Sequence, residues 1–477
     1  MTSISRRRFV SHSAALCAIG AAGARGPARA QPGGSGLTPK LPERGELVIR
    51  GAYVMTMDPA LGDIAGGDVH VKGGEIVAVG RGLPAPGAPE IDGAGAIVLP
   101  GLVETHWHMW TTLFRSYAGD ERGKTYFPMV LAFTKFLNPD DVYAGTRLGA
   151  VEALSSGITT VHDWAHSIRD FSYAEAELRA LADTGIRARF SYSWYQGMPD
   201  SEVFNLADLD RLHGDWAKYD REGLIHLCLG WRGMWRASLL KPEVYRTEFE
   251  HARRLGIPVA VHLGSRREQP RMIAMHAKEG FLGKDVLVAH ATWAQPDEIA
   301  MLAESGSPVT LSPITDARVG YGFAPASDLL AAGVTCALSV DTVAVTGTCS
   351  LFENMKFLAA IENGRAESEF KFLPRRALEM GTIGGAQALG IDDRVGSLKP
   401  GKRADLIMVS TREPNIGVFT DPAHMLVEAT ESRNVELVVA DGRIMKRDGK
   451  LVGLDAGAAV ADAAAAFRRL RSQASWR

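Results

Sequence analysis

The middle of the chain alternates short apolar runs with segments of helical character. Eight such runs occupy residues 97–105, 158–162, 188–194, 225–230, 258–262, 286–290, 308–311 and 334–341. Helical stretches separate most of them, for example at residues 174–184 and 243–255. Apolar strands with helices between them are typical of a parallel sheet that helices cover, and eight units predict closure. We therefore expect an α/β fold, with a (β/α)8 TIM-like barrel over residues 100–397.

The sequences on both sides of this region show a different pattern, in which short runs of alternating apolar and polar residues are separated by Gly and Asp. Examples are residues 47–50, 69–71, 76–79, 405–409 and 435–442. Such patterns indicate an antiparallel β module. We expect residues 45–99 and 398–454 to form one composite β-sandwich. A Pro/Gly-rich linker is predicted at residues 31–44, and an Ala-rich C-terminal helix at residues 455–477.

Residues 1–30 are predicted to be a signal peptide. Arginines at residues 6–8 precede an apolar run at residues 14–24, and Ala28-Arg29-Ala30 then forms an Ala-x-Ala cleavage site. This order of charged, apolar and small residues resembles a bacterial twin-arginine signal peptide and argues against a disordered basic tail. The apolar run is too short for stable membrane insertion. We expect a periplasmic or secreted protein.

The charge balance argues against nucleic-acid binding. The chain has 53 Lys and Arg against 55 Asp and Glu, a net charge of −2. Without the first 30 residues, which hold five arginines and no acid, the balance is 53 − 5 = 48 against 55, or −7. No basic stripe remains that could neutralise phosphates. A small-molecule partner is therefore expected, and the sequence leaves a homo-oligomer open.

Residue types that bind metals occur at the C-terminal ends of the apolar runs, where barrels of this type carry their chemistry. His106 and His108 follow the first run, His262 and His290 end the fifth and sixth, and Asp341 ends the eighth. His106 and His108 are two residues apart on an extended segment, so both side chains point to the same side. One histidine at a strand end is usually structural, but the joint pattern indicates one divalent ion, Zn²⁺ or Fe²⁺.

Five sequence motifs contain or accompany these candidate metal-binding residues. The first is residues 100–108, Pro-Gly-Leu-Val-Glu-Thr-His-Trp-His, and the others are residues 157–161, 288–290, 384–390 and 396–406. Together they resemble the amidohydrolase superfamily over nearly all of residues 45–450, and within it the cytosine deaminase and chlorohydrolase branch.

The resemblance implies a mononuclear site whose metal ligands are His106, His108, His262 and Asp341. It also implies that His290 orients the water or stabilises the intermediate, and that Asp341 is the general base. The fourth apolar run, residues 225–230, contains no Lys that could bridge a second metal.

One position departs from the family. Deaminases of this branch usually carry a Glu three residues after the histidine of the fifth strand, where this chain has Ser265. Glu268 lies three positions further on and does not match that motif. A serine cannot act as a carboxylic acid at neutral pH, which argues against standard aminopyrimidine or purine deamination. A better leaving group, or another proton donor such as His166, is the alternative.

Aromatic residues near the strand ends predict a flat, aromatic or heterocyclic substrate, although each Trp taken alone is as readily explained by packing. The expected pocket residues are Trp107, Trp110, Trp164, His166, Trp194, Trp231, Ser265 and Glu268.

The function expected from all these features is hydrolysis of a non-peptide C–N bond, in an amide, amidine or heterocycle, by a metal-activated water. Two alternatives are a dechlorinase or C–S hydrolase, and a periplasmic binding protein on a decayed barrel. The retained Asp341 argues against the binding protein, because binding alone does not require it.

Overall fold

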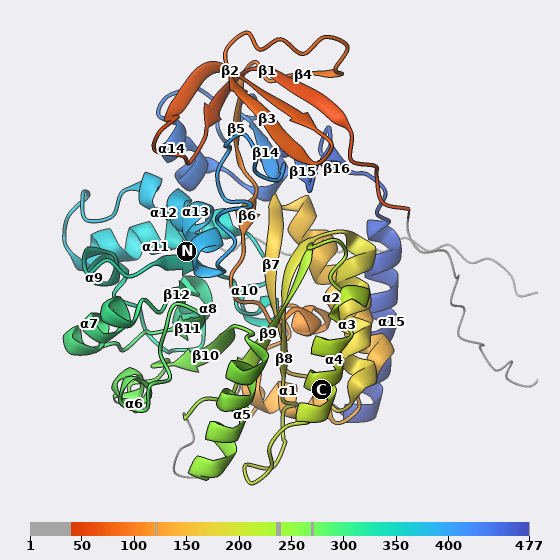
Figure 1. Cartoon of the computed structure of the whole chain (residues 1–477), viewed down its shortest axis with the longest axis vertical. Coiled ribbons are helices and arrows are strands. Elements are labelled where there is room, and N and C mark those ends of the chain that lie inside the picture. The colour runs from red at the N-terminus through yellow and green to blue at the C-terminus, as the bar shows by residue number, and fades with distance from the viewer. Residues whose placement is uncertain (1–39, 120, 122, 235–239, 269–270, 477) are drawn as a thin grey trace, which may run out of the picture. The chain divides into compact units, whose positions relative to one another are not determined.

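The computed structural model describes residues 40–476 except 120, 122, 235–239 and 269–270. The predicted signal peptide and most of the predicted linker lie outside the described residues. One sheet contains eight parallel strands in chain order, which the helices surround (Figure 1). The strands are β6 (Leu102–Val103), β7 (Ile158–Ala165), β8 (Arg187–Ser193), β9 (Ile225–Trp231), β10 (Val259–Leu263), β11 (Val286–His290), β12 (Val309–Leu311) and β13 (Cys336–Leu338). This order is that of the predicted barrel.

Backbone contacts just beyond β6 and β13 close the sheet into a barrel. The N–H of Thr105 donates to the carbonyl of Leu338 (3.3 Å), and the N–H of Asp341 donates to the carbonyl of His106 (2.9 Å). The N–H of His108 donates back to the carbonyl of Asp341 (2.8 Å). The seam therefore runs through residues that the sequence singled out as metal ligands, and the predicted barrel is confirmed.

The first apolar run does not form a single strand. Its first part is β5 (Ala96–Pro100), which belongs to a second sheet, and only β6 joins the barrel. Proline removes a ladder donor, and the chain passes so close to β7 at Gly101 that a Cβ there would collide with the side chain of Thr159. The chain therefore changes sheets at Pro100-Gly101.

The second sheet combines strands from both terminal regions, as predicted. Its order is β17-β16-β15-β14-β5-β1-β2-β3, with β4 paired to β1, so the strands form one hydrogen-bonded sheet. The strands are β1 (Glu46–Met55), β2 (Asp63–Lys72), β3 (Glu75–Gly80), β4 (Glu90–Asp92), β14 (Leu406–Ser410), β15 (Val435–Ala440), β16 (Arg443–Arg447) and β17 (Lys450–Leu451). It has its own apolar core, which includes Leu47, Val54, Val69, Leu406 and Val439.

The helices begin and end where local sequence signals favour it. In α2, Asn138 and Asp141 form a reciprocal capping box, and Pro139 occupies the first turn. The α-helices are α1 (Tyr126–Thr134), α2 (Pro139–Ser155), α3 (Phe171–Thr184), α4 (Leu206–Gly214), α5 (Pro242–Leu255), α6 (Met272–Lys278), α7 (Pro296–Ser305), α8 (Pro313–Arg318), α9 (Ala326–Ala331), α10 (Val343–Thr346), α11 (Leu351–Arg365), α12 (Pro374–Met380), α13 (Ile383–Ala388), α14 (Pro422–His424) and α15 (Ala456–Ala474). A 3-10 helix, η1 (Met109–Phe114), directly follows His108.

The C-terminal helix α15 packs against α2, and Arg147 of α2 forms an ion pair with Asp462 of α15 (2.9 Å). Within the part of the chain that the structure describes, no helix is both long enough and apolar enough to cross a bilayer.

Candidate metal centre

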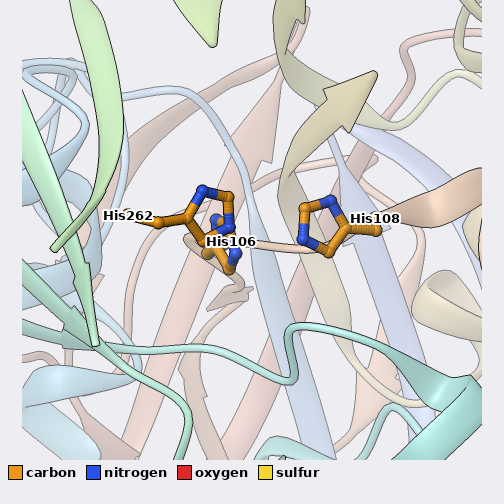
Figure 2. A group of neighbouring side chains, drawn as sticks. All are labelled: His106, His108 and His262. Atoms are coloured by element: carbon orange, nitrogen blue, oxygen red, sulfur yellow. The ribbon is translucent and has the colours of Figure 1, made fainter. Parts of the chain in front are cut away.

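Three imidazoles converge at the C-terminal end of the barrel. His106 and His108 follow β6 and His262 lies near the end of β10, and their rings point toward one another (Figure 2). One nitrogen from each ring lies within 4.8 Å of the others. The ring centroids of His106 and His262 are 4.7 Å apart, and those of His106 and His108 are 4.9 Å apart.

Asp341, just beyond β13, adds a carboxylate to this group. Its Oδ1 atom lies 3.4 Å from Nε2 of His106 and 3.2 Å from Nε2 of His108. Four donors placed tetrahedrally at about 2.1 Å from one ion would lie about 3.4 Å from one another. The observed spacing therefore fits shared coordination of a single ion.

The environment of these side chains also fits a metal ion. His106 is fully buried, yet neither of its ring nitrogens has a hydrogen-bond partner. Burial lowers the pKa of His106 to about 4 and that of His262 well below its ordinary value, so both rings are neutral. Burial opposes ionisation of Asp341, but the close Nε2 atoms of His106 and His108 hold its pKa well below the ordinary value. Neutral imidazoles and an ionised carboxylate are the states that a divalent ion requires.

Neighbouring groups hold the ligands in place. The buried carboxylate of Glu104 accepts the backbone N–H groups of His106 and Val340, each at 3.1 Å from Oε1, and so ties the two sides of the seam together. Burial raises the pKa of Glu104 to about 8. Nδ1 of His108 lies 3.4 Å from the carbonyl of Trp164, which leaves Nε2 facing Asp341.

His290, at the end of β11, forms a buried pair with Asp316 of α8. Nδ1 of His290 lies 2.9 Å from Oδ1 of Asp316, so Nδ1 donates and Nε2 remains available. Burial lowers the pKa of His290, but the carboxylates of Asp316 and Asp341 outweigh it and raise the pKa above its ordinary value. The left-handed backbone of His290 (φ 78°) and Asp341 (φ 61°) marks strain at both positions, which is common at functional sites.

A cavity of about 390 Å³ adjoins three of the four candidate ligands, His108, His262 and Asp341. Eight of its lining residues were expected to contribute to the site: His108, Trp164, His166, Trp194, His262, Ser265, His290 and Asp341. Eight others were not expected: Tyr126, Phe127, Gln196, Arg266, Thr315, Val319, Tyr321 and Thr342. Most of these eight follow strands in loops or on short helices, where no periodicity marks them.

His166 has a defined tautomer in this cavity. Its Nδ1 accepts the indole N–H of Trp110 (3.2 Å), because an indole nitrogen can only donate, and this contact is shorter than the 3.4 Å between the same Nδ1 and the carbonyl of Trp164. The proton of the neutral ring is therefore on Nε2. Burial, followed by the nearby His108, lowers the pKa of His166 well below its ordinary value, so the ring is neutral.

Four expected pocket residues lie elsewhere. Trp107 is buried in the main apolar core, because side chains alternate along an extended segment and His106 and His108 take the other side. Trp110 acts through His166 rather than lining the cavity. Trp231 packs on Phe249 and Phe281, with centroids 4.9 and 5.1 Å away. The exposed Glu268 lines a separate outer cavity.

Comparisons with known proteins agree with this geometry. The model of the amidohydrolase family matches residues 97–445. A 5'-deoxyadenosine deaminase from Methanosarcina mazei is 30% identical over 437 residues, which are 89% of this chain and 98% of the relative.

Two solved structures are similar over nearly their whole length. A zinc-bound adenosine deaminase from Xanthomonas campestris has a TM-score of 0.80 and 25% identity, and the match covers 90% of this chain and 100% of the other. The zinc complex of atrazine chlorohydrolase from Arthrobacter aurescens TC1 has a TM-score of 0.75 and 25% identity, covering 88% and 100%.

Proposed function

The chain belongs to the amidohydrolase family, and from that premise we propose that it removes an amino group by hydrolysis from a heteroaromatic ring. It is a hydrolase of carbon–nitrogen bonds other than peptide bonds. One observation carries the proposal: the cluster of three imidazoles and Asp341 adjoins a cavity of about 390 Å³, which His108, His262 and Asp341 line. Five aromatic side chains, Tyr126, Phe127, Trp164, Trp194 and Tyr321, line that cavity and suit a flat ring.

His106, His108, His262 and Asp341 would hold one divalent metal ion. Zinc is the candidate, since the two similar structures contain it and imidazole with carboxylate suits it. When bound, such an ion acidifies water and supplies a nucleophile at neutral pH.

Two residues would handle protons and charge around the reacting carbon. The ionised Asp341 accepts the proton that the attacking water loses. His290 donates a hydrogen bond from Nε2 to the ring atom on which negative charge develops, and Asp316 holds the imidazole in the orientation that allows this.

The leaving amine also needs a proton, and this chain has no carboxylate at the position where the family usually has one. Ser265 lines the cavity there, and its hydroxyl cannot replace an acid at neutral pH. His166 lines the same cavity and presents a free Nε2–H. We assign the neutral His166 as a hydrogen-bond donor to the substrate ring or its leaving group, and the proton that departs with the amine is the one that Asp341 accepts from the water.

A second reaction, hydrolytic dechlorination, is favoured by the same serine, because chloride leaves without a proton. The decisive experiment uses zinc-loaded enzyme and matched amino- and chloro-substituted triazines, pyrimidines and purines. Release of ammonia is expected from the amino compounds. Release of chloride alone would replace deamination with dechlorination, and binding without any turnover would favour a binding protein. Metal-free enzyme is the control.

We also propose export of the chain through the twin-arginine route into the periplasm, on the basis of residues 1–30. An already folded, metal-loaded enzyme is a suitable cargo for that route.

A further inference from the structure

An outer cavity of about 500 Å³ continues from the catalytic cavity. The two cavities share the lining residues Tyr126, Phe127, Arg266, Val319 and Tyr321. A substrate whose reacting ring occupies the inner cavity would therefore place its opposite end in the outer one.

The outer cavity has an unusual charge for a chain with a formal net charge of −2. Arg266, Arg267 and Arg318 line it, and Glu268 is the one acidic residue of its lining within the part of the chain that the structure describes. Among the described residues, no ion pair includes any of these three arginines, although Arg271 on the same loop pairs with Asp297. The cavity thus holds an excess of positive charge without internal compensation.

Two of the arginines are held against aromatic rings. The guanidinium carbon of Arg266 lies 5.3 Å from the ring centroid of Phe127 and 5.4 Å from that of Tyr321, both shared by the two cavities. That of Arg267 lies 5.4 Å from the ring centroid of Trp293, which lines the outer cavity. A guanidinium beside a ring has five N–H donors, and an edge of two of them matches the two oxygens of a carboxylate or phosphate. Arg266 uses part of this capacity in a hydrogen bond with the hydroxyl of Tyr321.

We propose that the substrate is an anionic heterocycle, whose carboxylate or phosphate group binds Arg266, Arg267 and Arg318 in the outer cavity while the ring lies at the metal centre. This inference rests on the proposed function, which places the reacting ring at the metal centre. Binding of the anionic group by the arginines does not require turnover and can be measured separately. Arginines that are exposed and only solvated would not make the protein prefer an anionic ring compound over a neutral one.

Binding without turnover provides the first test. Calorimetry with zinc-loaded protein would compare benzoate and phenyl phosphate with the neutral benzamide. Arg267→Gln with Arg318→Gln should weaken binding of at least one anion about tenfold, and leave benzamide unchanged. Whichever of the two anions responds more identifies the preferred group. Arg271→Gln is the matched control, because it removes the same charge from the same loop but outside both cavities.

Two outcomes would overturn the proposal. The first is equal anion affinity in the double variant and the parent protein. The second is anion binding that disappears in Asp341→Asn but persists in the double variant, since the anion would then be ligating the metal ion only.

Turnover provides the second test and separates the two proposals. Pairs of amino-heterocycles with and without an anionic substituent would be compared in the parent enzyme and the Arg267→Gln, Arg318→Gln variant. The anionic member should lose its advantage through a raised KM, with kcat unchanged. Equal kcat/KM for the anionic and neutral members of a pair would contradict the anion proposal alone. If the protein binds the anions but hydrolyses none of the amino-heterocycles, the result would contradict the proposed function alone.

Discussion

Nδ1 of His290 lies 2.9 Å from Oδ1 of Asp316, and the two buried side chains form a pair next to the metal ligand His262, whose ring centroid is 5.4 Å from that of His290. The carboxylate holds Nδ1–H of His290 toward Asp316 and leaves Nε2 facing the cavity, and its charge raises the pKa of the imidazole, which favours the form with a proton on both nitrogens.

Asp316→Asn should lower kcat about 10- to 100-fold while KM and metal content stay close to those of the parent enzyme. An amide can still fill the space, but it no longer stabilises the protonated imidazole of His290, in which Nδ1–H points to residue 316 and Nε2–H donates into the cavity. Steady-state kinetics and metal analysis would measure this. Thr292→Val, which removes only the 3.4 Å contact to the other oxygen of Asp316, is the control. A kcat unchanged in Asp316→Asn would contradict the role of the pair.

Asp341→Asn should lower the zinc content and reduce turnover to near background, because the carboxylate is both a ligand and the proton acceptor. Metal analysis by mass spectrometry and the release of ammonia would measure the two effects. Asp448→Asn, at an exposed site, provides the control for the loss of one negative charge. Full activity in Asp341→Asn would remove Asp341 from the mechanism.

The barrel and the convergence of the ligands were predictable from the sequence, because their signals are local and repeated. Each apolar run specifies a strand, and parallel strands bring their C-terminal ends to one face of the barrel. His106, His262 and Asp341 therefore meet although long segments separate them. The division of the first run at Pro100 was not predicted, since an apolar run does not show which of two sheets each half joins.

The walls of the cavity were less predictable for a physical reason. Asp316, Tyr321 and Arg266 lie after strands, in loops or on short helices, where no periodic pattern relates a residue to the site. Trp107 shows a different limitation. Its position between two inward-facing histidines already indicated that it faces away, so the alternation rule outweighs its aromatic character.

Lys446 should make the stability of the protein depend on pH. Its Nζ donates to the carbonyls of Ser155 (2.6 Å) and Ser432 (3.4 Å), and burial lowers its pKa to about 8. Between about pH 8 and 10.4 the unfolded chain binds more protons at this lysine than the folded chain does, so the lysine's contribution to the free energy of unfolding rises with pH. This contribution is lost as the pH falls through 8.

Denaturant unfolding of the parent and of Lys446→Met between about pH 7 and 10 would measure that contribution. The difference in free energy of unfolding, parent minus variant, should increase across this range. Lys356→Met is the matched control, because Lys356 also donates to a backbone carbonyl (Glu428, 2.8 Å) but at an exposed position. A difference that stays constant with pH would contradict the lowered pKa.

Export should depend on the paired arginines near the N-terminus. Arg6→Lys together with Arg7→Lys should leave the precursor in the cytoplasm, because a receptor reads this motif and lysine does not replace it. Cell fractionation with immunoblotting would follow both forms. Arg25→Lys, beyond the apolar run, controls for the loss of an arginine elsewhere in the same segment. Normal periplasmic delivery of the double variant would exclude this route.

The last prediction concerns Ser265 and Glu268, which line different cavities. If no carboxylic acid takes part in the reaction, Ser265→Ala should cost less than about tenfold in kcat/KM, or about 1.4 kcal/mol of transition-state stabilisation. Glu268→Gln should cost equally little, because the exposed Glu268 lines only the outer cavity, away from the metal centre. Kinetics on the best substrate from the amino-heterocycle panel would compare the two variants.

Ser265→Glu extends the comparison, since it introduces a carboxylic acid into the catalytic cavity. Such an acid can protonate a ring nitrogen or a departing amine, so turnover of amino-purines should rise above that of the parent enzyme. Ser265→Gln, of similar size but without a titratable proton, separates protonation from a change of pocket shape. A collapse of turnover in Glu268→Gln alone, at unchanged metal content, would mean that the loop delivers Glu268 to the metal centre during the reaction. Ordinary deaminase chemistry with a displaced acid would then replace the assignment of His166 as the donor.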